Sequence, residues 1–467
     1  MSGTYKQGEH KVLSGVYTRI VAALEEVSNG TRGIVTYPFT SDWGPVNVLQ
    51  ECYSDKDFNE LYNAENTALT ANTVYNHAFK GKPSMVLGYR MATAAAAKGI
   101  ALLNDDTSAK ALELETLYPS KRSFAARVTE SLSGGKSIEI LEKEKVLMKV
   151  EGATVAEIVA ALNSSEYVRV KSAGEKLPAD NAGVTFSGGN NGEVVTGTEY
   201  AGYRAEVEAD MRAKAIALDD YTDPAEVVAT EGWLRRVRND GLYITFVNGG
   251  PLSWDTNLSA AHQKSKAFNH RAIVNVGNGA DGFTAGEVAI YIAARVASVA
   301  LNRTLTDEDT PYKLVNKKLT RAERIEAKKV GTLILVQQGD KVIIDEAINT
   351  LTVPGEDERI EMSKIRVSNA LDQMAYDLEL FGDEYKKTRS NTPEARETYA
   401  ATVEKEYFEP LVLQEVFKPG ATYRPDPDYH GTNPIYTAKL DEAYFVSGVT
   451  PVDSMEKIYQ KANVSFN

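Results

Sequence analysis

The stretch from Thr284 to Asn302 constrains the fold more than any other part of the sequence. It reads TAGEVAIYIAARVASVALN and is apolar on most faces of a helix, and a helix that is apolar all round is stable only in the interior of a protein. Thr284 and Glu287 have the spacing of a capping box, which begins such a helix. A strand, AIVNVG, precedes it. We therefore expect a buried helix packed against a sheet.

Strands and helices alternate on both sides of the segment from 93 to about 184. Near the N-terminus, the runs IVTYPF, VNVLQECY and SMVLGYR have the apolar, β-branched composition of buried strands, and a helix is expected over about 56–80. Between about 193 and 340 the alternation returns, and Asp223 before Pro224 is a favourable helix start. This order predicts an α/β layer in which helices cover a sheet.

Residues from 93 to about 184 have a different pattern. Short β-prone pieces such as SFAARVTE and KSIEILEKEKVLMKV alternate with Gly/Ser turns, and one short helix is expected near 154–163. A polar, Gly-rich segment, FSGGNNG from Phe186, follows. We interpret this region as a mainly-β domain inserted into the α/β domain.

The sequence thus predicts an α/β multidomain chain. After 341, Val367, Leu371, Met374, Leu378 and Phe381 recur at helical spacing, so an α+β domain is expected at the carboxyl end. The expected boundaries are an N-terminal arm (1–20), the first part of the α/β domain (21–92), the inserted mainly-β domain (93–185), the second part of the α/β domain (186–340), an α+β C-terminal domain (341–449) and a C-terminal arm (450–467).

Composition excludes several classes of function. The net charge of −13 disfavours nucleic-acid binding, which needs a basic face. No run approaches the ~20 apolar residues of a membrane span, and the start MSGTYKQGEHK has no secretory apolar region. The single cysteine, Cys52, forms no internal disulfide and is expected in a strand.

No catalytic or cofactor motif occurs. The five histidines have no metal-ligand spacing and are expected at the surface or in loops, and HExxH, paired CxxC, GxSxG and P-loop strings are absent. We therefore expect no enzyme activity, no cofactor and no catalytic, cofactor-binding or metal-ligating residue. Two alternatives stay open: an α/β enzyme, hydrolase-like but of unknown activity, and a surface-layer or adhesin-like assembly protein.

One segment is locally basic in this acidic chain. Glu323 and Glu326 are its only acidic residues, Thr320 and Glu323 form a second capping box, and Gly331 suits the end of the helix. The helix either presents an ordinary solvated face or docks onto an acidic partner. Its basic residues are Lys317, Lys318, Arg321, Arg324, Lys328 and Lys329.

Both chain ends are β-prone. Strands at chain ends either fray or add to the edge of a sheet, and addition to a neighbouring subunit joins copies through main-chain hydrogen bonds. Pairing within the same subunit is the alternative. The expected inter-subunit contacts are Val12, Gly15, Val16, Tyr17, Ile458, Tyr459, Val464 and Phe466.

Five strings stand out in chain order: Ser14-Gly15-Val16-Tyr17, Gly33-Ile34-Val35 with Asp42-Trp43-Gly44-Pro45, Phe186-Ser187-Gly188-Gly189 with Gly192, Ile348-Asn349-Thr350-Leu351-Thr352 with Lys364-Ile365-Arg366 and Asp372, and Thr450-Pro451-Val452-Asp453-Ser454-Met455-Glu456-Lys457-Ile458-Tyr459. Together they resemble the contractile phage tail sheath family, most closely its short members from phages, defective prophages and bacteriocin-like particles of Gram-positive bacteria. The inserted β region departs from the family pattern, because ETLYPSKRSFAARV lacks a G-x-x-G-N string.

The resemblance implies a structural protein whose central domain has a non-catalytic, subtilisin-like fold. Such subunits polymerise helically around a tail tube through exchanged terminal arms, and contraction drives the tube through a host envelope. The implied partners are other copies of the chain, the tail tube protein, which the basic helix would face, and the baseplate and tail terminator proteins. Direct nucleic-acid contact and membrane insertion are not expected. Assembly is expected in the bacterial cytoplasm, and the product is a virion tail or a released tail-like particle.

Overall fold

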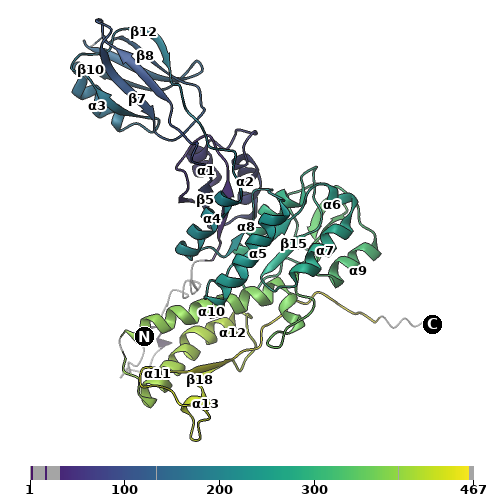
Figure 1. Ribbon diagram of the computed structural model, residues 1–467. Helices are drawn as coiled ribbons and strands as arrows, with labels where there is room; N and C mark the ends of the chain where they lie inside the picture. The colour runs from purple at the N-terminus through teal and green to yellow at the C-terminus, as the bar shows by residue number, and fades with distance from the viewer. Residues whose placement is uncertain (1, 4–15, 18–31, 133, 388, 462–467) are drawn as a thin grey trace. The chain divides into compact units, whose positions relative to one another are not determined.

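The computed structural model describes residues 2–3, 16–17, 32–132, 134–387 and 389–461 (Figure 1). Contacts within the chain divide it into two units. The main unit consists of Gly33–Asp372 with Asp453–Asn467, and the small unit consists of Met1–Arg32 with Gln373–Val452. Within the described residues, no helix combines the length and the apolarity that crossing a membrane requires.

A six-stranded sheet forms the centre of the main unit. Its strands are parallel except for β4, which runs antiparallel to β5 at one edge. Every residue of β3 and β5 is buried, as expected for strands covered on both faces. In spatial order the strands are β15 (Ile273–Val276), β14 (Thr245–Gly249), β13 (Ala215–Ile216), β3 (Ile34–Phe39), β5 (Met85–Arg90) and β4 (Leu49–Cys52).

Helices cover both faces of this sheet. On one face, Val35, Tyr37 and Phe39 pack with α1 (Asp55–Tyr62), α2 (Ala71–Ala78), the 3₁₀ turn η1 (Phe79–Gly81) and α8 (Ala285–Ser298). On the other face, Ile34 and Leu87 pack with α4 (Gly197–Asp210), α5 (Pro224–Asn239) and the end of α7 (Leu258–Phe268), which the short α6 (Ser253–Thr256) precedes. The single helix expected over 56–80 is two helices, because Asn63 ends α1 in the left-handed conformation.

The expected buried helix is α8. The Thr284 hydroxyl accepts from the Glu287 amide at 2.9 Å, and the Glu287 carboxylate accepts from the Thr284 amide at 2.7 Å, so the predicted capping box is confirmed. The Tyr37 hydroxyl donates to the Ile290 carbonyl at 2.7 Å and links the helix to β3. Residues on all sides of α8 are buried.

Seven strands and one helix form a β region between β5 and α4. All of their pairings are antiparallel, in a four-stranded sheet (β10-β9-β8-β12) and a three-stranded sheet (β11-β7-β6). Buried and less buried residues alternate along β8, as in a strand with one face on a core. The elements are β6 (Ile100–Asn104), β7 (Lys110–Thr116), β8 (Phe124–Glu130), β9 (Lys136–Glu142), β10 (Lys145–Gly152), α3 (Val155–Asn163), β11 (Val168–Ala173) and β12 (Asn181–Thr185).

Two side chains connect the β region with the sheet of the main unit. Trp43, in the loop after β3, packs in the core of the β region, with its ring 5.3 Å from that of Tyr118 and 5.4 Å from that of Phe124. The fully buried Arg90, at the end of β5, donates to the carbonyls of Gly44 at 2.7 Å and Pro119 at 2.8 Å.

The rest of the main unit comprises α9 (Arg321–Lys329), the hairpin β16 (Leu335–Gln338) and β17 (Lys341–Ile344), the 3₁₀ turn η2 (Ile360–Ser363) and the start of α10 (Ile365–Lys386). Val342, Ile344 and Ala347 lie in the same core as α8. The two units therefore divide at Gln373, whereas the sequence placed the start of its C-terminal domain at 341. Residues 341–372 group with the main unit because their apolar side chains are buried there.

The small unit is helical with a short hairpin. Tyr399, Val403, Tyr407, Leu411 and Phe417 are buried in it. Its elements after α10 are α11 (Pro393–Val403), the π-helical turn η3 (Glu404–Phe408), α12 (Glu409–Leu413), β18 (Thr422–Pro425), α13 (Pro427–His430) and β19 (Phe445–Gly448), of which β18 and β19 are antiparallel partners.

Candidate functional site: the carboxyl-terminal arm

Part of the expected N-terminal arm is described. Val16 and Tyr17 form β2, which pairs in parallel with β1 (Ser2–Gly3). This pairing lies within the chain, and contact of Val16 and Tyr17 with another subunit stays a prediction. The other two expected contacts, Val12 and Gly15, lie outside the described residues.

The C-terminal arm begins as an added strand in the small unit. The Lys418 amide donates to the Thr450 carbonyl at 2.8 Å, and the Val452 amide donates to the Val416 carbonyl at 2.9 Å. Phe417 and Pro451 form the bridge between these bonds. The first residues of the expected arm are therefore paired within their own subunit.

The next residues of the arm belong to the main unit and contact other parts of that unit through polar side chains. The Arg366 guanidinium donates to the Ser454 hydroxyl at 2.8 Å, and the Thr306 hydroxyl donates to the Glu456 carboxylate at 3.0 Å. Lys364 forms an ion pair with the other oxygen of Glu456. Two strings that carry the family resemblance, Lys364-Ile365-Arg366 and the one containing Ser454 and Glu456, therefore contact each other.

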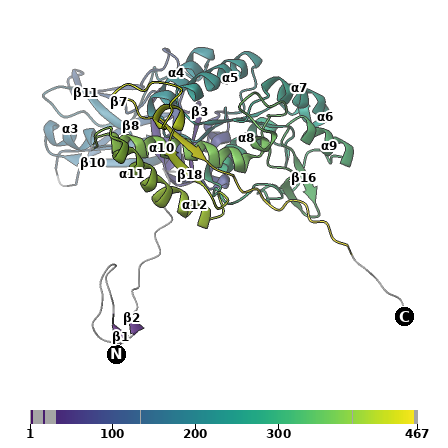
Figure 2. The ribbon, with the colours of Figure 1, turned by 90° about the horizontal axis from the view of Figure 1, so that it is seen from below.

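Beyond Glu456 the arm is exposed. Each described residue from 457 to 461 is exposed, including the apolar surfaces of Ile458 (68% exposed) and Tyr459 (91% exposed). Figure 2 shows this segment extending from the ribbon as a single trace. Val464 and Phe466 lie outside the described residues.

The predicted basic helix is α9, and its capping box is confirmed. Three cations of the basic segment, in the helix or just before it, have partners: Lys317 pairs with Glu323 at 2.9 Å, Arg324 with Asp345 and Lys328 with Glu346. These residues were expected to form one positive surface with the others. Instead, among the six basic residues of this described segment, only Lys318, Arg321 and Lys329 are both exposed and without an ion pair.

A shallow hollow of about 310 Å³ lies beside α9. It is lined by Arg321, Arg324, Ile325 and Lys328 from the helix and by Asp345 and Glu346 from the chain after β17. Both signs of charge meet around the exposed side chain of Ile325. Such a surface suits contact with another protein better than binding of a polyanion.

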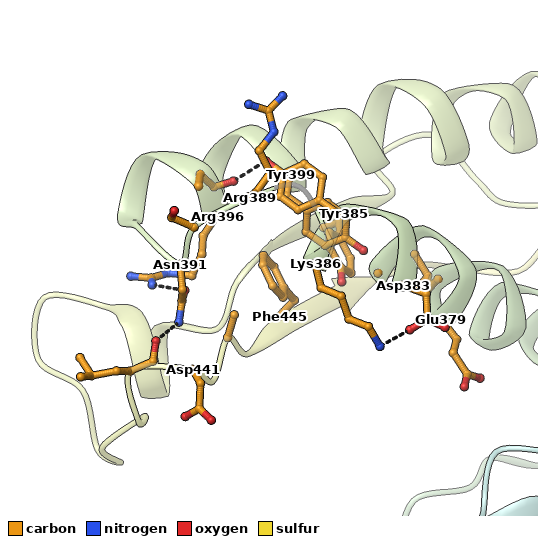
Figure 3. Close-up of a pocket in the computed structure, with 17 residues that line it drawn as sticks. Glu379, Asp383, Tyr385, Lys386, Arg389, Asn391, Arg396, Tyr399, Asp441 and Phe445 are labelled. Atoms are coloured by element: carbon orange, nitrogen blue, oxygen red, sulfur yellow. Dashed lines mark hydrogen bonds and ion pairs between the residues drawn. The ribbon is translucent and has the colours of Figure 1, made fainter.

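A larger hollow, of about 620 Å³, lies in the small unit. The rings of Tyr385 and Tyr399 lie 4.4 Å apart on its wall, and Lys386 pairs with Asp383 at its rim (Figure 3). On the opposite side, the Asn391 amide donates to the Leu440 carbonyl at 3.0 Å. Aromatic rings and charges of both signs make this a surface suited to a peptide segment.

Side chains of this protein fill the position in the sheet at which α/β enzymes usually bind ligands. Strand order reverses between β3 and β13, and open α/β sheets bind ligands beyond the carboxyl ends of such strands. There the hydroxyls of Tyr200 and Thr70 donate to Asp219 at 2.6 and 2.5 Å, and the Thr284 hydroxyl donates to Asp220 at 2.6 Å. The void beside Asp220 is only about 10 Å³.

Burial changes the proton affinity of these carboxyl groups and of Cys52. It raises the pKa of Asp219 and raises the pKa of Asp220 to about 6, with Thr284 opposing the latter shift. It also raises the pKa of the Cys52 thiol to about 12, so the thiolate does not form near neutral pH.

One histidine prediction is wrong. His77 was expected at the surface or in a loop but is buried in α2, where its Nδ1 lies 2.8 Å from the Tyr312 hydroxyl. Burial lowers its pKa to about 3, which keeps the ring neutral. Among the described residues, no group of three or more His, Cys, Asp or Glu side chains is arranged to hold a metal ion.

Sequence reasoning did not identify the residues that hold the arm. Lys364, Arg366, Ser454 and Glu456 belong to strings that carry the family resemblance, and Thr306 belongs to none. Ser454 and Glu456 are two positions apart, which places their side chains on one side of an extended chain, and this spacing is a signal that could have identified them.

The fold is similar to that of contractile sheath proteins. A sheath tail protein from Desulfitobacterium hafniense is 20% identical, with a TM-score of 0.68 over 94% of this chain and 100% of that chain. One from Listeria innocua is 19% identical, with a TM-score of 0.70 over 91% and 93%. The contracted helical sheath of the anti-feeding prophage is 9% identical, with a TM-score of 0.55 over 97% and 99%.

No family model matches the sequence, and no curated protein matches it either. The resemblance read from the five strings is thus confirmed by structure, at the level of the fold. The mixed α/β architecture is that of these proteins along nearly their whole length.

Proposed function

Because the chain has the fold of contractile tail sheath proteins, we propose that it is a structural subunit of such a sheath. It polymerises with other copies of itself into a helical tube around a tail tube. Contraction of that tube of subunits then drives the tail tube through the envelope of a target cell. The similarity of fold over more than nine tenths of the chain supports this proposal.

The observation that carries the proposal is the exposed end of the C-terminal arm. Ile458 and Tyr459 present apolar surface on a β-prone segment that is solvent-exposed within its own subunit. Such a segment is stabilised when it adds to the edge of another sheet, through main-chain hydrogen bonds and burial of alternate side chains. Contacts of this head-to-tail kind do not close on themselves and generate helical polymers.

The small unit of another copy offers a matching surface. Its hairpin β18–β19 is a two-stranded sheet, and such a ribbon gains stability from further strands. Phe445 and Tyr423, one from each strand, also line the 620 Å³ hollow. An added strand beside β19 would place apolar side chains against these rings.

Contraction is proposed as a change between two packings of the same subunits. The extended sheath is a kinetically trapped state, and release at the baseplate lets subunits repack into a more stable, shorter tube. Arms joined by backbone pairing keep the subunits connected meanwhile. This proposed repacking needs no nucleotide, because the difference in stability between the two packings supplies the free energy.

A second contact is proposed for α9, with the tail tube protein. The exposed cations available for this contact are Arg321 and Lys329 on the helix and Lys318 just before it. An acidic patch on the tube would complement them. The baseplate and tail terminator are the proposed partners at the two ends of the sheath, and assembly is proposed to take place in the bacterial cytoplasm before release of the particle.

The test of the proposal is assembly of the purified protein, followed by negative-stain electron microscopy. Wild type is expected to form striated tubes of uniform width. Ile458→Ser with Tyr459→Ser is expected to remain a folded, unassembled subunit, because the segment loses the apolar surface that pairing would bury. The matched control is Leu132→Ser, which removes an exposed leucine from a turn of the β region and should form tubes. Tubes from the double-serine protein would contradict arm exchange, and absence of tubes from wild type under all conditions would contradict the sheath proposal.

A further inference from the structure

Over residues 454–457, side chains that contact the main unit alternate with exposed side chains. Ser454 and Glu456 turn towards the main unit, whereas Met455 and Lys457 are exposed. This alternation has the period of two that is typical of extended chain. The side of the arm that faces the main unit is polar, and the side that faces solvent includes the apolar Met455, which is 82% exposed.

The polar side meets a prepared set of partners. Lys364 and Glu456 retain only 17% and 13% of their side-chain exposure, although both residue types are ordinarily solvated. Thr306 accepts a hydrogen bond from the Ala347 amide at 2.9 Å, which orients its hydroxyl towards Glu456. Arg366 projects from the first turn of α10 and is buried.

The neighbouring cations are paired with other carboxylates, whereas Lys364 pairs mainly with the arm. Arg324 and Lys328 are engaged by Asp345 and Glu346, and Lys364 lies 3.7 Å from Glu346 but closer to Glu456. Partial desolvation and the carboxylates of Asp345, Glu346 and Glu456 raise the pKa of Asp307. The arm thus brings a carboxylate into a region that already holds three, and Lys364 is the cation that compensates for it.

We propose that Thr306, Lys364 and Arg366 form a clamp for the root of the arm, so that only the segment beyond Glu456 is available to another copy of the chain. The clamp is a property of the single subunit, and its role in assembly rests on the proposed function. The clamp determines the residue at which the exchangeable segment begins and the direction in which that segment leaves the subunit. It also limits the conformational freedom that the segment loses on capture, which strengthens binding.

Limited digestion with trypsin, followed by mass spectrometry, tests the clamp in the full-length protein before it assembles. Trypsin needs several extended residues on both sides of the bond it cleaves. Cleavage after Lys457 therefore requires release of Ser454 and Glu456, whereas cleavage after Lys461 does not. Each rate is divided by that of a free peptide spanning 448–467. Wild type is expected to be cleaved after Lys457 at least about tenfold more slowly than the peptide, and after Lys461 at nearly the peptide's rate.

The variant Lys364→Gln is expected to raise cleavage after Lys457 about tenfold and to leave cleavage after Lys461 unchanged. Lys341→Gln is the matched control, because it removes a lysine from an exposed ion pair with Asp309 and should change neither rate. If Lys364→Gln fails to fold, Glu456→Gln and Ser454→Ala test the same contacts from the arm, each compared with its own free peptide. Wild-type cleavage after Lys457 at the peptide's rate, or no effect of these substitutions, would overturn the clamp.

The two proposals fail differently. Tubes formed by a subunit whose Lys457 is freely cleaved overturn the clamp and leave the sheath function standing. A protected Lys457 in a protein that never forms tubes supports the clamp and contradicts the sheath function.

Discussion

Asp220 is a residue whose charge the folded chain disfavours. Its carboxyl group lies between Thr284, the N-cap of α8, and Gly286, where a Cβ would lie 2.3 Å from the Asp220 Oδ1. Burial raises its pKa to about 6, and Glu287 and Asp219 add to the shift. Because this pKa lies above the unfolded value, the folded protein holds the proton more tightly. The resulting stability is fully present below about pH 4 and is lost as the pH rises through about 6.

Asp220→Asn is therefore expected to remove a part of the pH dependence of unfolding. The variant should gain about 2 kcal/mol of stability relative to wild type between about pH 4.5 and about pH 7.5, because asparagine accepts the Thr284 hydrogen bond without a charge. Urea unfolding at both pH values measures this gain. Asp106→Asn, at an exposed site, is the control. An equal difference at both pH values would contradict this assignment.

For single residues, contacts between side chains close in sequence could be predicted, whereas contacts between side chains far apart in sequence could not. Thr284 with Glu287 and Thr320 with Glu323 are three residues apart, and their side chains meet wherever a helix begins. Lys364 and Glu456 are 92 residues apart, and their ion pair depends on where the chain returns after the small unit. Arg90 shows the same limit, because its acceptors are carbonyls of Gly44 and Pro119, which no side-chain pattern reveals.

Among the elements, α9 carries two kinds of cation: Arg324 and Lys328 form ion pairs, whereas Arg321 and Lys329 do not. Arg324→Glu with Lys328→Glu should lower the free energy of unfolding by about 1 to 2 kcal/mol, because it places like charges beside Asp345 and Glu346. Arg321→Glu with Lys329→Glu should change it by under about 0.5 kcal/mol and instead weaken assembly on the tail tube protein. Chemical unfolding and co-sedimentation with that protein measure the two effects. Unchanged co-sedimentation of the second variant would return α9 to the interpretation of a solvated helix face.

The existence of elements was easier to predict than their boundaries. The short helix near 154–163 lies at Val155–Asn163, because its N-cap Thr154 and its apolar spacing agree. The helix expected over 56–80 contains a break, since Asn63 and the following turn separate α1 from α2. The division at Gln373 was missed for a different reason. It falls within the continuous helix α10, and helical periodicity carries no information about which core a helix enters.

For the whole molecule, the proposed arm exchange would make each subunit both a donor and a recipient. A protein lacking residues 457–467 keeps Ser454 and Glu456, and can receive an arm but cannot give one. Mixed with wild type, it should shorten the tubes in proportion to its share, because each incorporated copy interrupts a chain of contacts. Tube lengths in electron micrographs measure the effect. Undiminished length at equal shares of the two proteins, with the truncated protein present in the tubes, would contradict the donor role of the arm.

The buried thiol of Cys52 has a practical consequence. It is the only cysteine in the chain, it is fully buried in the central sheet, and its pKa of about 12 keeps it unreactive towards maleimide near neutral pH. The native protein is therefore ready for site-specific labelling without removal of any residue. A cysteine introduced at Tyr459 would carry the only reactive sulfur, and a fluorophore attached there would report capture of the arm as it occurs.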